Sequence, residues 1–391
     1  MTSRERFKKV LQGQSPDRMP VTLHLFDHAR FVTKVYQEID PLDYSTINLK
    51  SIEFSKQLGA DVFARMLYDA NDPIHIFMGG LATDRQTADW QVQTEEIQEG
   101  STLIQRSVIT TPEGKLYQDY SINRLPDGQE MHACTKKPIR NPEDLELALK
   151  YEPPMDEQGF RDSLMPKVQR LKDALAEDGI LGIWVPSGPF NQSSLIYDLT
   201  ELYTLYLTDF PFYEKLMRFA MDRILGYTKI MKEAQPDVLI VGGNVPGGFL
   251  GPQVYNQYIL PFEKEYIDYC QDGGIPAMYH NCGQIMSLLE CYKKLGTRIV
   301  EPFTPPPGGD ADMAKAKEVV DGEYIMVGGV DKLELLLHGT VKQVREEVAK
   351  IVTTVKPGGN HILQNADSLE YNTPVENVRA YVETAVELGG Y

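Results

Sequence analysis

Short apolar segments alternate with longer amphipathic segments along most of this 391-residue chain, and this alternation limits the fold more than any other feature. The apolar segments have the length of β-strands, and the segments between them carry apolar residues at helical spacing. Alternating strands and helices are typical of a parallel sheet covered by helices. We expect eight strands, at residues 19–24, 61–66, 180–185, 237–242, 276–280, 298–302, 324–328 and 360–364.

Eight such units predict a (β/α)8 TIM barrel that forms a single domain over residues 1–391. An open, doubly wound sheet is the alternative. No Gly-x-Gly-x-x-Gly follows the first strand, which disfavours the dinucleotide-binding form of that fold. The opening segment MTSRERFKKVLQGQ predicts a helical extension before the barrel, with Thr2 or Ser3 as its cap.

Residues 80–140 have a different pattern from the rest of the chain. They consist of short alternating segments separated by Glu-Gly, Pro-Glu-Gly and Pro-Asp-Gly. These are turn sequences that join antiparallel strands. We therefore expect a small β-hairpin insert in this region.

Charge and cysteine content limit the partners and the compartment. The formal net charge is −17 and no basic run is present, so we expect no nucleic-acid partner. Four cysteines are too few for a disulfide framework in a chain of this length. No segment approaches the roughly twenty apolar residues of a membrane span, and the N-terminus lacks the apolar core of a signal peptide. We expect a cytoplasmic protein that has no membrane partner.

Polar or ionisable residues follow nearly every predicted strand, where TIM barrels place their active sites. The pattern predicts an enzyme. For substrate binding we select residues after the first, second, fourth and seventh strands: His24, Asp69, Asn244 and Asp331. For Asp331, which precedes the segment KLELLLHG, a helix-capping role is the alternative.

The segment YHNCGQ at residues 279–284 carries the sharpest chemical signal. His280 and Cys282 are two residues apart, so in an extended segment both side chains project to the same side. Imidazole and thiolate are natural zinc ligands, and Asp367 or Glu301 could supply a third. A buried cysteine beside a hydrogen-bonded histidine is the alternative for this pair. The predicted catalytic residues are His280, Cys282, Glu301 and Asp367.

Several segments resemble the uroporphyrinogen decarboxylase superfamily, and in particular its branch of corrinoid-dependent methyltransferases. The opening MTSRERFKKVLQGQSPDRMPV resembles the start of that family. The segment GPQVYNQYILPFEKEYIDYCQDGGIPAMYHNCGQ resembles the part in which the branch carries His-x-Cys-Gly. GGDADMAKAKEVVDGEYIMVGGVD and GGNHILQNADSLEYNTPVENVRAYVETA resemble its last two strand–helix units.

The resemblance implies a barrel in which zinc, held by His-x-Cys and a later cysteine, assists methyl transfer. The methyl group would move between a small methyl compound or thiol and the cobalamin of a separate corrinoid protein. His280 and Cys282 match the first two ligands. The later cysteine of the family stands six residues before a Thr-Pro pair, where this chain has Asp367, and no cysteine follows Cys291. The implied metal ligands are thus His280, Cys282 and Asp367, and the alternatives are that Glu301 completes the site or that zinc is absent.

Two other functions remain open at this stage. A carbon–carbon lyase without a metal would use Asp69, Asp27 and His24 for acid–base chemistry. Decarboxylation of uroporphyrinogen itself is disfavoured, because the segment LFDHARFVTK offers Arg30 alone where that branch has an arginine-rich motif for the substrate's carboxylates. A barrel that binds a corrinoid or tetrapyrrole without catalysis is the other alternative.

Overall fold

The structure is a computed structural model that describes residues 1–25, 30–66, 68, 80–83, 85–125, 130–245 and 247–391. Its contacts divide the chain into two compact units. The first unit comprises Met1–Asp69, Leu164–Val185 and Met231–Tyr391, and the second comprises Ala70–Ser163 and Pro186–Ile230. The expectation of a single domain over residues 1–391 stays a prediction.

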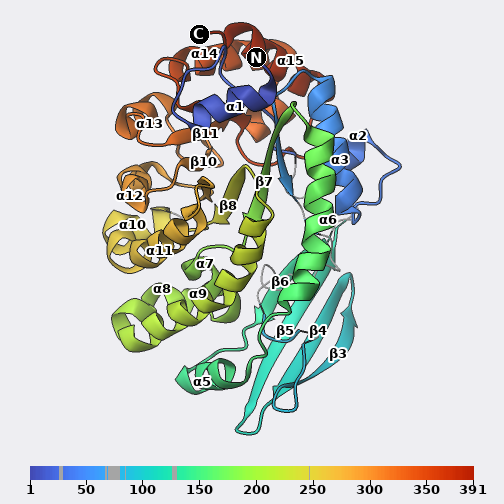
Figure 1. Cartoon of the computed structure of the whole chain (residues 1–391), viewed down its shortest axis with the longest axis vertical. Helices are drawn as coiled ribbons and strands as arrows, with labels where there is room; N and C mark the ends of the chain where they lie inside the picture. The colour runs from blue at the N-terminus through green and yellow to red at the C-terminus, as the bar shows by residue number, and fades with distance from the viewer. Residues whose placement is uncertain (26–29, 67, 69–79, 84, 126–129, 246) are drawn as a thin grey trace. The chain divides into compact units, whose positions relative to one another are not determined.

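The first unit contains the predicted barrel. Eight strands pair in parallel in the order β1-β12-β11-β10-β9-β8-β7-β2, of which Figure 1 labels β7, β8, β10 and β11. Two hydrogen bonds join β1 and β2, the first and last strands in this order. They run from the Asp61 amide to the Val21 carbonyl (2.7 Å) and from the Phe63 amide to the Thr22 hydroxyl (3.2 Å). The TIM-barrel prediction is therefore confirmed. The strands are β1 Val21–Thr22, β2 Val62–Met66, β7 Gly179–Val185, β8 Val238–Gly242, β9 Ala277–His280, β10 Ile299–Phe303, β11 Ile325–Val330 and β12 His361–Asn365.

Helices follow the strands as the sequence predicts, and none of those described is long and apolar enough to cross a membrane. The α-helices are α1 Ser3–Leu11, α2 Arg30–Val35, α3 Tyr44–Gln57, α5 Pro142–Tyr151, α6 Glu157–Leu175, α7 Pro189–Ile196, α8 Leu199–Thr208, α9 Phe210–Glu233, α10 Gly247–Val254, α11 Leu260–Gln271, α12 Leu289–Leu295, α13 Met313–Val320, α14 Val341–Val355 and α15 Val375–Leu388. Three short helices are η1 Tyr255–Ile259, η2 Met286–Leu288 and η3 Lys332–Leu337.

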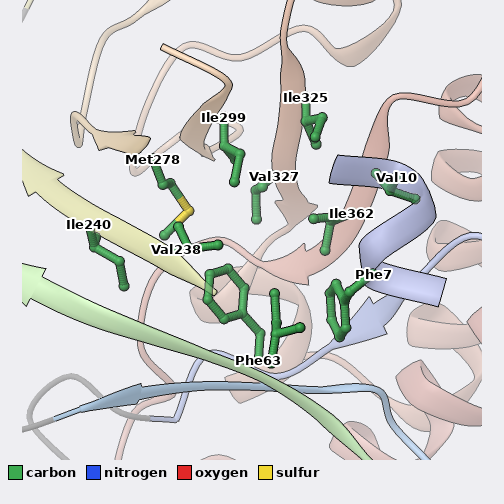
Figure 2. Close-up of a cluster of buried hydrophobic side chains, with 11 residues drawn as sticks. Phe7, Val10, Phe63, Val238, Ile240, Met278, Ile299, Ile325, Val327 and Ile362 are labelled. Carbon is green, nitrogen blue, oxygen red and sulfur yellow. The ribbon is translucent and has the colours of Figure 1, made fainter. Parts of the chain in front are cut away.

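An apolar layer fills the part of the barrel nearest the amino ends of the strands. Alternate residues of a strand point to the same face, so each strand contributes every second residue to the interior. Figure 2 shows these side chains converging on one another from the strands and from α1. They are Phe7, Val10, Phe63, Ile180, Val238, Ile240, Met278, Ile299, Ile325, Val327 and Ile362.

Helix α1 closes this end of the barrel. A capping box between Thr2 and Glu5 begins the helix, as the sequence predicts. Arg4 of this helix bonds to the Gly179 carbonyl (3.1 Å) at the start of β7, and to Asp237 (2.7 Å) just before β8. Phe7 of the next turn enters the barrel.

The buried Asp61 carboxylate, just before β2, holds α1 and the segment after it in place. It accepts bonds from the guanidinium groups of Arg6 (2.5 Å) and Arg18 (2.6 Å) and from the Val21 amide (3.0 Å). Both of its oxygens are therefore occupied, which is the condition under which a buried carboxylate is tolerated.

The second unit contains the predicted hairpin insert. Its four antiparallel strands pair in the order β3-β4-β5-β6, within residues 80–140 as expected. Their bounds are β3 Gln91–Glu99, β4 Thr102–Thr110, β5 Lys115–Arg124 and β6 Glu130–Lys136.

Replacing the α1 residue that reaches the barrel core should destabilise the protein. The Phe7 ring is fully buried and lies 6.0 Å from the Phe63 ring. Phe7→Ala is expected to lower the free energy of unfolding by about 3–5 kcal/mol, because it leaves a cavity in a closed core. Lys8→Ala on the exposed face of α1 is the control, with an expected change within about 0.5 kcal/mol. Guanidinium chloride denaturation measures both, and equal midpoints would contradict the role of α1.

Candidate functional site

A layer of polar side chains lies next to the apolar layer of the barrel, on the side of the carboxyl ends of the strands. On four strands the polar residue comes two positions after an apolar core residue, so both face the interior. The sheet register places His280 of β9 opposite Glu301 of β10. All members of the layer are buried. They are His24 after β1, Arg65 of β2, His280, Glu301 and Gln364 of β12.

Arg65 and Glu301 form an ion pair across this layer. Strands β2 and β10 are not neighbours in the sheet, so the pair spans the barrel interior. Arg65 donates to both carboxylate oxygens of Glu301, with 2.6 Å from Nη1 to Oε1. It also donates to Gln364 (2.9 Å) and to a ring nitrogen of His24 (3.1 Å), while the Gln364 amide donates to Glu301 (3.2 Å).

His280 connects this ion pair to Cys282. Its Nδ1 lies 2.7 Å from Oε1 of Glu301, and its Nε2 lies 2.8 Å from the sulfur of Cys282. Because the carboxylate can only accept, Nδ1 carries the hydrogen of the first contact and Nε2 faces the thiol. The Cys282 thiol, the His280 imidazole and the Glu301 carboxylate thus form one continuous chain of side-chain contacts.

The charged forms of His280 and Glu301 stabilise each other. Burial disfavours a charged imidazole, but the neighbouring Cys282 and Glu301 outweigh it and raise the pKa of His280 well above its usual value. Burial alone would raise the pKa of Glu301. Its contacts with Arg65 and His280 more than offset that effect and hold the pKa of this carboxyl far below its usual range. Glu301 is therefore a carboxylate at neutral pH.

Asn281 lies between His280 and Cys282 and faces the other way. Its buried amide binds both backbone groups of Val245, donating to the carbonyl (2.9 Å) and accepting from the N–H (2.6 Å). The backbone then turns at Gly283, whose φ of 89° lies in the left-handed region that favours glycine. These contacts fix the segment that presents Cys282.

Trp184, near the end of β7, lies beside the same histidine. The two rings are 5.1 Å apart and nearly perpendicular. The indole N–H is buried without a hydrogen-bond partner in the described structure, and so is the Nε–H of Arg65.

Of the other predicted residues, Asp331 has a capping role, Asn244 is exposed, and Asp69 and Asp27 lie outside the residues that the structure describes. Asp331 caps η3, accepting from the amides of Leu333 (2.6 Å) and Glu334 (3.0 Å), so its capping role is realised. It also lines a cavity of about 470 Å³ beside α13 and α14, and no residue of the polar layer lines that cavity. Asn244 is exposed after β8 with a φ of 50°. Asp69 and Asp27 lie outside the described residues.

Asp367 does not join His280 and Cys282. Its carboxylate pairs with Lys332 (3.1 Å) and accepts from the Ser368 amide (2.7 Å). In the part of the chain that the structure describes, no three His, Cys, Asp or Glu side chains lie in a position to hold a metal ion. The predicted set of three zinc ligands is therefore not assembled, because Asp367 has a cationic partner and Glu301 is bound by Arg65. The described residues do not fit a zinc site.

Arg65 and Gln364 belong to the site but were not selected from the sequence. Arg65 interrupts the apolar segment DVFARM of a predicted strand. A charge inside a buried strand must be paired, so this position is itself a signal of a polar site. Its partner Glu301 stands 236 residues later, and sequence patterns give no means of matching the two.

Comparison with known proteins identifies the family. A model of the uroporphyrinogen decarboxylase (URO-D) family matches residues 126–388, well over half of the chain. The chain belongs to this family. The resemblance predicted from the sequence is thereby confirmed.

Individual URO-D relatives carry two kinds of name. A methylated-thiol–coenzyme M methyltransferase of Methanosarcina mazei is 23% identical over 250 residues, which cover 63% of this chain and 63% of that protein. The methylcobamide:CoM methyltransferase MtbA of Methanosarcina acetivorans is 23% identical over 66% of this chain and 72% of its own length. A uroporphyrinogen decarboxylase of Thermus thermophilus is 27% identical over 45% of this chain and 49% of its own length.

A solved structure has the same fold. It is a methyltransferase from Methanosarcina mazei that covers 99% of both chains with a TM-score of 0.70 at 16% identity. This likeness confirms the fold. The activity must be inferred from the site residues.

Breaking one side of the central ion pair should be costly, and removing both sides less so. Arg65→Gln and Glu301→Gln are each expected to lower the free energy of unfolding by about 3–5 kcal/mol, because each leaves an unpaired buried charge. The double variant is expected to be more stable than either single variant. Urea denaturation of the four proteins gives the coupling energy. The matched control is Glu383→Gln, which breaks the exposed pair with Arg345 (2.7 Å) and should cost about 0–1 kcal/mol. Additive losses at positions 65 and 301 would contradict the pairing.

Proposed function

We propose that this URO-D family protein is a corrinoid-dependent methyltransferase. It moves a methyl group between a small O-, N- or S-methyl compound or a thiol and the cobalamin of a separate corrinoid protein. Relatives named methylcobamide:CoM and methylated-thiol–coenzyme M methyltransferase support this class of reaction. The observation that carries the proposal is the Cys282–His280–Glu301 chain at the carboxyl ends of the barrel strands.

The proposed chemistry uses this chain to manage the charge of the leaving group. When a methyl group leaves an oxygen, nitrogen or sulfur atom, negative charge develops on that atom, and a proton or a positive charge must offset it. His280 is the group that donates this proton from Nε2, the nitrogen that faces Cys282. Glu301 holds the imidazole at Nδ1 and stabilises its charged form. The methyl group passes to the cobalamin substrate as the heteroatom gains the proton.

The remaining predicted residues have a smaller part in this proposal. His24 lies in the polar layer through its contact with Arg65 and stays a predicted substrate-binding residue. Asp331 and Asp367 are left out, because their carboxylates are occupied by helix capping and by Lys332. Asn244 and Asp69 stay predictions.

Loss of either end of the thiol–imidazole pair should abolish most of the activity. The full-length protein is mixed with cob(I)alamin and a panel of methyl ethers, methylamines and methyl thioethers, and methylcobalamin formation is followed by absorbance. His280→Ala is expected to lower the rate by about 10²–10⁴-fold, the usual contribution of a positioned proton donor. Cys282→Ala is expected to lower the rate as well, because it removes the contact at Nε2 that positions this donor. Cys291→Ala, which removes a buried cysteine outside the site, is the control and should retain the native rate.

Two results would contradict this function. One is an unchanged rate in both site variants. The other is turnover of a porphyrinogen without any corrinoid, which would favour the decarboxylase activity named for the Thermus thermophilus relative.

A further inference from the structure

We propose that this site works without a bound zinc ion and that the guanidinium of Arg65 supplies its fixed positive charge. The inference rests on the proposed function for its catalytic meaning, since methyl transfer needs a cation or proton donor near the leaving group. Its test does not depend on activity.

The first argument is that both carboxylate oxygens of Glu301 already accept hydrogen bonds. A metal needs free lone pairs on its ligands, and a catalytic zinc normally has three protein ligands. Both oxygens of Glu301 already accept from Arg65, and further contacts come from His280 and Gln364. The carboxylate nearest to His280 is therefore neutralised by a protein cation.

The second argument is the position of the other candidate ligand. Asp367 pairs with Lys332, and Lys332 also contacts Glu370 (3.2 Å). Among the residues that the structure describes, His280 and Cys282 are left as two adjacent donors whose atoms face each other at 2.8 Å. Two ligands from this part of the chain fall short of the set that a catalytic zinc requires.

The third argument is the kind of buried polar atom that has no hydrogen-bond partner among the described residues. The buried Nε–H of Arg65 and the indole N–H of Trp184 can only donate hydrogen bonds. Such groups cannot bind a cation. They suit an oxygen, nitrogen or sulfur acceptor, which is the kind of atom that carries the transferred methyl group in the proposed reaction.

Arg65 is suited to act as a fixed charge. Its side chain has no exposed surface, and it is held by Glu301, Gln364 and His24. A charge held by the fold before the substrate arrives needs no reorganisation during the reaction, and burial strengthens its field. We assign Arg65 as a positioning residue that orients Glu301 and, through it, His280.

The test is the zinc content of tag-free, full-length protein that has been equilibrated with zinc and then dialysed. The native protein is expected to retain far less than one zinc per chain, no more than Cys282→Ala retains. One zinc per chain in the native protein, lost in His280→Ala and Cys282→Ala, would overturn the proposal. Because this readout needs no substrate, it stands even if methyl transfer is not found.

Two variants of Arg65 test why zinc is absent. Arg65→Gln frees the Glu301 carboxylate next to Nδ1 of His280, so this variant is expected to retain more zinc than the native protein. Arg65→Lys keeps the positive charge and should stay as free of zinc as the native protein. Circular dichroism checks that each variant is folded. If Arg65→Gln does not fold, the native protein and Arg65→Lys still decide the question. A folded Arg65→Gln without zinc, or zinc uptake by Arg65→Lys, would overturn the role given to Arg65.

Discussion

Arg65 and Glu301 form an ion pair inside a closed barrel, where neither side chain has any exposed surface. Removing two charges from water costs several kcal/mol for each ion, and attraction alone repays this only when the geometry is good and the remaining hydrogen-bonding groups are satisfied. Here two parallel contacts join the charges, and Gln364, His24 and His280 bind most of the remaining polar atoms. The orientation of His280, and with it the position of its Nε2 beside Cys282, depends on this pair.

The barrel interior is divided into two layers with different tasks. The layer closed by α1 is apolar, and it derives its stability from packed side chains such as Phe7 and Phe63. The layer above it is polar, and it holds the chain from Arg65 to Cys282. TIM barrels separate stability and function in this way along the strand direction, because the loops that accept substrates follow the carboxyl ends of the strands.

Membership of the URO-D family does not by itself decide which reaction this protein catalyses. The URO-D family model matches residues 126–388, and relatives bear names of both methyl transfer and decarboxylation. Of the metal ligands that the resemblance implies, His280 and Cys282 are in contact, but Asp367 pairs with Lys332. The activity of this chain must therefore be argued from its own side chains. The arrangement that the structure offers is a buried cation, a carboxylate, an imidazole and a thiol in contact.

The sequence by itself determined the eight strands, the hairpin insert, the cap of the first helix and the common side of His280 and Cys282. Each of these depends on residues close together in the chain, through side-chain alternation, turn composition or capping. Strand ends could be predicted only approximately: β1 is limited to Val21–Thr22, whereas 19–24 were expected. Only the tertiary structure decided that Glu301 rather than Asp367 contacts His280, and that Arg65 joins them. Those contacts link residues up to 236 positions apart, and they arise from barrel closure and strand register, which bring inward-facing side chains of distant strands into one buried layer.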